Sequence, residues 1–280
     1  MTRRSAPPRR RSSGGDADVS ASADAESVDD AARRVEELSR SAKEAATAAP
    51  DSEPLSPEPS SGITLEDVSS HDGVQTFISL ADRYLGEIGY TEHGFRHAGL
   101  VSKISFNVLH RLGFEDRMAE LGAIAGYLHD MGNFVCRSMH SQTGSVLTYD
   151  ILKELGMSYK EIGIILGAIG NHEEEFGNPV NPVGAAVIVA DKSDVHRSRV
   201  RVKDPTIFDI HDRVNNAVER SFLRVDDAAH TLTLELTIDT ELAGVMEYFE
   251  IFLSRMVMCR RAAEHLGCEF KIDINGTKLL

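Results

Sequence analysis

The stretch Gly126-Tyr-Leu-His-Asp-Met-Gly132 places a histidine and an aspartate side by side at the end of an apolar segment. Apolar residues recur at helical spacing before this pair, which predicts a helix over Arg117–His129. A histidine or aspartate in such a segment is costly to bury unless it is paired or bound to a metal. His129 and Asp130 therefore mark a candidate metal site at the end of a core helix.

Helical spacing continues through most of residues 63–223, and glycines such as Gly113 and Gly156 punctuate it. Short turns between amphipathic helices favour a mainly α fold, a compact helical bundle. The further helices that this pattern predicts are Val74–Ile88, Phe95–Leu112, Thr143–Leu155, Tyr159–Asn171, Pro182–Val195 and Ile210–Phe222.

Four more side chains of the metal-ligand type lie within these helices or at their ends. His97 follows the start of one helix, His140 opens another, His172 ends a third, and Asp191 lies in the apolar stretch Val187–Lys192. Imidazole and carboxylate ligands suit Mn, Fe, Co, Ni or Zn, whereas Mg prefers oxygen ligands only. The sequence therefore predicts a divalent transition-metal site.

The order His, His-Asp, His, His, Asp over roughly residues 93–201 resembles the HD-domain superfamily of metal-dependent phosphohydrolases. The two histidines between the pair and the last aspartate resemble the branch that holds two or more metals. The segments around His140, His172 and Asp191 look similar to bacterial HD proteins that cleave dinucleoside polyphosphates, and more distantly to cyclic-dinucleotide phosphodiesterases.

The resemblance implies a role for each position. His97, His129, Asp130 and Asp191 would hold a first metal, and Asp130 would bridge to a second, completed by His140 and His172. Asp130 and His129 would then be the catalytic pair. Two neighbouring ions can activate a water and clamp both oxygens of a phosphoryl displacement, so a metal-bridged hydroxide is the expected nucleophile.

One position departs from the family pattern, because Asn133 stands where many HD proteins carry a lysine. Other cations would then have to contact a substrate phosphate, and guanidinium groups pair bidentately with phosphate. Arg96, Lys103 and Arg137 are candidates, but the segment after Asp191 is preferred. The expected phosphate-binding residues are Lys192, Arg197, Arg199 and Arg201. A solvated basic face is the alternative interpretation of this segment.

Acidic residues beside the candidate ligands have two interpretations. The run Glu173–Glu175 fits a solvated helix end, but one of these glutamates could orient a ligating histidine or act as general acid. Asp194, one helical turn after Asp191, could also support a ligand. The remaining histidines are left outside the predicted site: His71, His93, His110, His211, His230 and His265.

Composition limits the class of protein. The net charge of −14 argues against a nucleic-acid-binding face, although metal ions can still attract a small anion. Three widely spaced cysteines suit a reducing compartment rather than a disulfide framework. No apolar run approaches the ~18 residues of a membrane span, and a cytoplasmic location is expected.

The two ends of the chain differ from the helical middle. Residues 1–60 contain no aromatic residue and predict a disordered tail. Thr231–Ile238 and Phe270–Ile274 alternate like strands around the amphipathic helix Leu242–Leu266. The expected domains are thus a tail at 1–60, an HD-type metal-binding domain at 61–225 and a small α/β appendage at 226–280. This appendage could be a structural cap, a regulatory lid or a homodimer interface.

Three functions remain open. The first is hydrolysis of a phosphomonoester or phosphoanhydride, with a small nucleotide as the expected substrate. The second is a non-catalytic sensor that binds metal and nucleotide without cleaving it, which the departure at Asn133 favours. The third is a di-iron oxygenase, because the same ligand types also suit iron.

Overall fold

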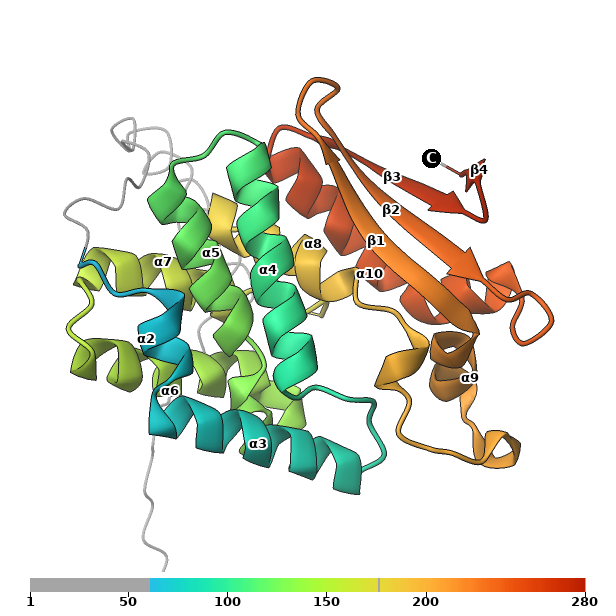
Figure 1. Cartoon of the computed structure of the whole chain (residues 1–280), viewed down its shortest axis with the longest axis horizontal. Helices are drawn as coiled ribbons and strands as arrows, with labels where there is room; N and C mark the ends of the chain where they lie inside the picture. Colours follow the sequence, from blue (N-terminus) through green and yellow to red (C-terminus); the bar gives the residue numbers. More distant parts are fainter. Residues whose placement is uncertain (1–60, 176, 280) are drawn as a thin grey trace, which may run out of the picture. The chain divides into compact units, whose positions relative to one another are not determined.

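The computed structural model of the chain describes residues 61–175 and 177–279, and the tail predicted at 1–60 lies outside this range. The described part is mainly helical with a small sheet near its C-terminal end, which confirms the predicted fold class (Figure 1). Its helices before the sheet are α2 (Leu65–Ser69), α3 (Asp72–Glu87), α4 (Phe95–Arg111), α5 (Asp116–Leu128), α6 (His140–Glu154), α7 (Tyr159–Gly170), α8 (Pro182–Lys192) and α9 (Ile210–Ala217). Among the described residues, no helix has both the length and the apolar character needed to cross a membrane.

Helix α8 is the centre of the helical body, and it contacts α4, α5, α7 and the long helix α10 (Val245–His265). Its residues from Val183 to Ala190 are all buried, and several are alanines that let neighbouring helices approach closely. Asn181 caps its start by accepting a hydrogen bond from the Gly184 amide at 2.7 Å. A helix this enclosed holds its last turn, and Asp191 with it, in a fixed position.

The sheet has the strand order β1-β2-β3-β4, formed by β1 (Val218–Asp226), β2 (Thr231–Ile238), β3 (Glu269–Ile274) and β4 (Thr277–Lys278). β1 and β2 form an antiparallel hairpin, whereas β2 and β3 are parallel and joined through α10. Leu232, Leu234 and Leu236 alternate on the buried face of β2, as their spacing predicts. α10 packs on both the sheet and α8, so it connects the sheet to the helical body.

One predicted element is wrong in its second half. The helix expected over Ile210–Phe222 ends at Ala217, and the chain continues as strand β1. Apolar residues in this segment fit helical spacing, but Leu223 and Val225 pair with Leu234 and Leu232 of β2. This pairing outweighs the local pattern. β1 crosses the predicted boundary between residues 225 and 226. The division of the chain into these domains stays a prediction.

A close crossing of the chain brings the start of α6 beside the turn that follows α5. A Cβ atom at Gly132 would lie 2.1 Å from the backbone oxygen of His140 and 2.4 Å from the amide of Gly144. Only glycine fits between these backbones. Gly132 thereby allows Asp130 and His140, from two different segments, to approach one another.

An enclosed ion pair joins α5 to α7. Glu161 is fully buried, and its Oε1 accepts a hydrogen bond from Arg117 Nε at 2.6 Å. Although burial raises the pKa of Glu161, its bonds to Arg117 and Ser61 outweigh burial and lower it. Removing one partner of such a pair leaves an uncompensated charge in the interior.

We therefore expect Glu161→Ala to lower the free energy of unfolding by roughly 3 kcal/mol, measured by urea denaturation at pH 7. The pKa of Glu161 is lower in the folded state than in the unfolded state. Its contribution to the free energy of unfolding is therefore fully present above the unfolded pKa and is lost as the pH falls through the folded pKa. The difference between wild type and variant should shrink toward pH 3. Glu87→Ala, at an exposed helix end, is the control, and an equal effect of both substitutions would contradict the account.

Candidate metal centre

The predicted ligands converge from five segments of the helical body. α4 carries His97, the end of α5 carries His129 and Asp130, α6 begins with His140, the turn after α7 carries His172, and α8 carries Asp191. The histidines among them are at most 1% exposed, and Asp130 is 7% exposed. Residues separated by nearly a hundred positions in the sequence therefore form one buried polar cluster.

The first group in this cluster surrounds the Nε2 atoms of His97 and His129, which lie 3.3 Å apart. Asp191 Oδ1 is 3.3 Å from His97 Nε2 and 3.7 Å from His129 Nε2. Asp130 Oδ2 is 3.5 Å from His97 Nε2 and 3.3 Å from His129 Nε2. His97, His129 and Asp191 could hold a metal ion by this geometry.

A second group lies on the other side of Asp130. The Nε2 atoms of His140 and His172 are 3.0 Å apart. Asp130 Oδ1 is 3.3 Å from His140 Nε2 and 3.9 Å from His172 Nε2. His129, Asp130 and His172 also satisfy the geometry of a metal-binding trio. One carboxylate thus turns one oxygen to each pair of histidines.

The other ring nitrogen of each histidine has an acceptor of its own. His97 Nδ1 lies 2.7 Å from Asp194 Oδ2, and the Nδ1 atoms of His129, His140 and His172 lie 2.7–2.8 Å from backbone oxygens of Gly126, Arg137 and Ile169. These acceptors assign the proton of a neutral imidazole to Nδ1 and turn the Nε2 lone pair inward.

This donor set fits a bound transition metal. Two ligands about 2.1 Å from one ion lie roughly 2.9–3.4 Å apart in tetrahedral or octahedral geometry. The pairs His97–His129 and His140–His172, at 3.3 and 3.0 Å, match that spacing. Without a proton or a metal between them, two inward lone pairs at this distance would repel each other.

The charges in the cluster favour a bound cation. Burial is the largest influence on these groups and disfavours their charged forms. For His97, His129 and His140, interactions with nearby carboxylates outweigh burial and raise the pKa to about 9, 10 and 9. The same interactions hold the pKa of Asp130 well below its usual range, whereas burial and neighbouring cations lower that of His172. Ionised carboxylates that draw protons onto imidazoles would also attract a metal ion.

Only two of the four predicted phosphate-binding residues lie at the cluster. Lys192 and Arg199 line a small cavity together with Asp130, His140 and His172. Lys192 Nζ is 2.6 Å from Asp191 Oδ2, and Arg199, itself buried, donates to the Asp194 backbone oxygen at 2.8 Å.

The other two predicted cations point to different partners. Arg197 pairs with Glu219 at 2.9 Å, and Arg201 pairs with Asp82. Neither residue lines the cavity beside the cluster. A role in phosphate binding stays a prediction for them, and the structure gives each an ion pair on the outside of the protein.

The structure adds residues that sequence reasoning did not place at the site. Arg255 of α10 lines the cavity, and its Nε is 3.1 Å from Glu174 Oε1. Arg255 lies in an amphipathic helix far from Asp191 in the sequence, and nothing in that helix's pattern indicates that this residue reaches the site. His93, left out of the predicted site, also lines the cavity and packs edge-on against His97.

Asn133, which departs from the pattern that the family resemblance implies, touches the cluster. Its Nδ2 donates to Asp130 Oδ1 at 2.9 Å, and its Oδ1 accepts from Arg137 at 3.1 Å. Arg137 lines the same cavity. The asparagine therefore holds the central carboxylate, while Arg137, four positions later in the chain, brings positive charge to the site.

Comparisons with known proteins leave the family open. No family model matches the chain. It is similar to an uncharacterized protein of Methanocaldococcus jannaschii, with 26% identity over 202 residues that cover 64% of this chain and 76% of the relative. The buried cluster of histidines and aspartates is compatible with an HD-type metal site.

Asp194 offers a specific test of this candidate metal centre. It binds the candidate ligand His97 through Nδ1, the ring nitrogen that faces away from the cluster. It accepts hydrogen bonds from His97 Nδ1 at 2.7 Å and from Arg96 at 2.8 Å. We expect Asp194→Asn to weaken cobalt binding about 10- to 100-fold in a calorimetric titration, since such supporting partners orient the ligand. Asp150→Asn, on α6, should bind cobalt like wild type. Equal affinities for all three proteins would contradict the assignment.

Proposed function

We propose that the chain is a metal-dependent phosphohydrolase that cleaves a phosphomonoester or phosphoanhydride of a nucleotide. One observation carries the proposal: Asp130 turns Oδ2 to His97 and His129 and Oδ1 to His140 and His172. A carboxylate placed in this way suits a shared ligand between two ions. His97, His129 and Asp191 would hold one ion, and His140 and His172 the other.

Paired ions at such a site supply Lewis-acid stabilisation of a phosphoryl group and lower the pKa of water. The chain's own residues orient the substrate. Lys192, Arg199, Arg255 and Arg137 border the cluster and bring four cations to the place where phosphate charge develops. Phosphoryl transfer depends mainly on positioning and on charge stabilisation of this kind.

A second cavity of about 320 Å³ adjoins this cationic border and has the size of a small-ligand site. It shares His93, Arg137, Arg199 and Arg255 with the cavity at the cluster. The shared arginines would bind phosphate. Side chains farther along the second cavity would contact the remainder of the substrate: Tyr90, Asp209, Asp212, Asn215 and Phe252.

The proposal predicts phosphate release from nucleotides that depends on Mn or Co and stops when a chelator is added. We expect Asp130→Ala to lower kcat at least 10³-fold, because it removes the carboxylate common to both groups of histidines. Asp150→Ala is the control and should keep full turnover. Metal and nucleotide binding without any product would instead favour the sensor function.

Arg255 provides a separate test of substrate binding. We expect Arg255→Ala to raise KM at least tenfold, because a charged hydrogen bond to a phosphate is worth about 1.5–3 kcal/mol. Metal content should stay unchanged. Arg260→Ala, on the exposed side of the same helix, should leave KM unchanged. A KM of Arg255→Ala equal to that of wild type would remove this residue from the substrate site.

A further inference from the structure

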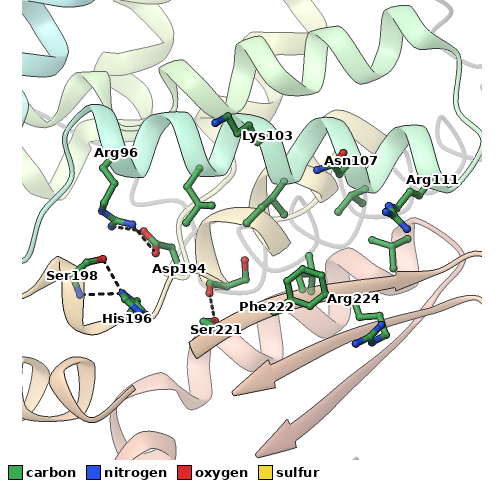
Figure 2. Close-up of a pocket in the computed structure, with 16 residues that line it drawn as sticks. Arg96, Lys103, Asn107, Arg111, Asp194, His196, Ser198, Ser221, Phe222 and Arg224 are labelled. Atoms are coloured by element: carbon green, nitrogen blue, oxygen red, sulfur yellow. Dashed lines mark hydrogen bonds and ion pairs between the residues drawn. The ribbon is translucent and has the colours of Figure 1, made fainter. Parts of the chain in front are cut away.

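A larger cavity than the one beside the cluster lies between helix α4 and strand β1, away from the candidate metal centre (Figure 2). Its volume is about 690 Å³, within the range of small-molecule sites. One wall is a stripe of α4 with helical spacing, Arg96, Leu100, Ile104, Asn107 and Arg111. The opposite wall is the edge strand β1 over residues 221–225.

The cavity combines apolar walls with positive charge. Leu100, Ile104, Val108 and Phe222 give it an apolar interior, and Phe222 is 46% exposed. Four cations border it against a single acid, Asp194; these cations are Arg96, Lys103, Arg111 and Arg224. This local excess of positive charge stands out in a chain whose net charge is −14.

Two of the four cations form no ion pair with the described residues. Arg96 pairs with Asp194 and Glu92, and Arg224 pairs with Glu235. Lys103 and Arg111 are exposed, and within residues 61–175 and 177–279 neither forms an ion pair. Charges left without a partner beside an apolar cavity are suited to a ligand that is both anionic and apolar.

The cavity is connected to the metal centre by three side chains. Arg96 donates to both carboxylate oxygens of Asp194, at 3.3 and 2.8 Å. Asp194 in turn accepts from His97 Nδ1 at 2.7 Å. Figure 2 shows Arg96 and Asp194 joined at one end of the cavity. An anion that attracted Arg96 would therefore alter the support of His97.

We propose that this cavity is a second binding site, for an anion with an apolar ring-sized body, and that its occupancy changes metal affinity at the centre. The phosphate, sulfonate or carboxylate of the ligand lies among Arg96, Lys103 and Arg111, the three cations of the α4 wall, where it competes with Asp194 for Arg96. Its apolar body lies against Leu100, Ile104 and Phe222. This ligand is distinct from the proposed substrate, which lies beyond His97 at the arginines that border the cluster.

The test uses 8-anilinonaphthalene-1-sulfonate, a sulfonate on apolar rings, as a fluorescent probe of the full chain after treatment with chelator. We expect saturable binding to wild type and at least a tenfold weaker affinity in Lys103→Glu/Arg111→Glu. The matched control Arg83→Glu/Lys160→Glu makes the same charge change at exposed helical positions elsewhere and should bind within twofold of wild type. Equal affinities of the two double variants would overturn the site.

The connection to the metal centre is tested by titrating cobalt with and without saturating probe. We expect the cobalt Kd of wild type to change at least threefold, and the probe Kd to change by the same factor when cobalt is bound. The cobalt Kd of Lys103→Glu/Arg111→Glu should not respond to the probe. A wild-type cobalt Kd that is unaffected by the probe would overturn the coupling. Neither measurement uses turnover, so both outcomes are independent of the proposed phosphohydrolase activity.

Discussion

The described structure depends on one constraint: four buried imidazoles turn their Nε2 atoms toward a single carboxylate, that of Asp130. The Nδ1 atom of each imidazole lies 2.7–2.8 Å from a hydrogen-bond acceptor. The Nε2 atoms lie 3.3 Å apart in the pair His97–His129 and 3.0 Å apart in the pair His140–His172. Buried polar groups this close need a shared positive charge to be stable together. A metal ion in each pair would meet that need and would make the cluster part of the folding energy as well as of the chemistry.

The packing of the helices fixes the positions of the side chains in this cluster. The enclosed helix α8 carries Asp191, and the close crossing at Gly132 brings Asp130 near His140. α10 packs against α8 and adds Arg255 to the border of the site. The C-terminal helix α10 thus places Arg255 at the border of the histidine and aspartate cluster, and strand β1 forms one wall of the cavity beside α4.

The resemblance of the His, His-Asp, His, His, Asp order to the HD-domain pattern named six side chains, and the structure brings them together in one buried cluster. Contacts set only by tertiary packing could not be predicted. Arg255 lies in a helix whose pattern indicates nothing beyond amphipathicity, and β1 follows its pairing with β2 rather than its local spacing. The sequence of the basic run after Asp191 favours one continuous basic surface. In the structure its three arginines instead pair with separate acids, Arg197 with Glu219, Arg199 with Asp194 and Arg201 with Asp82.

Anomalous X-ray diffraction from crystals of the full chain grown with cobalt would test the central claim most directly. We expect two anomalous peaks, one beside His97, His129 and Asp191 and one beside His140 and His172, with Asp130 contacting both. Absence of any peak within the cluster, at a cobalt concentration that saturates binding in solution, would contradict it. A single peak that left His140 and His172 without a metal would contradict the paired-ion site on which the proposed phosphohydrolase rests.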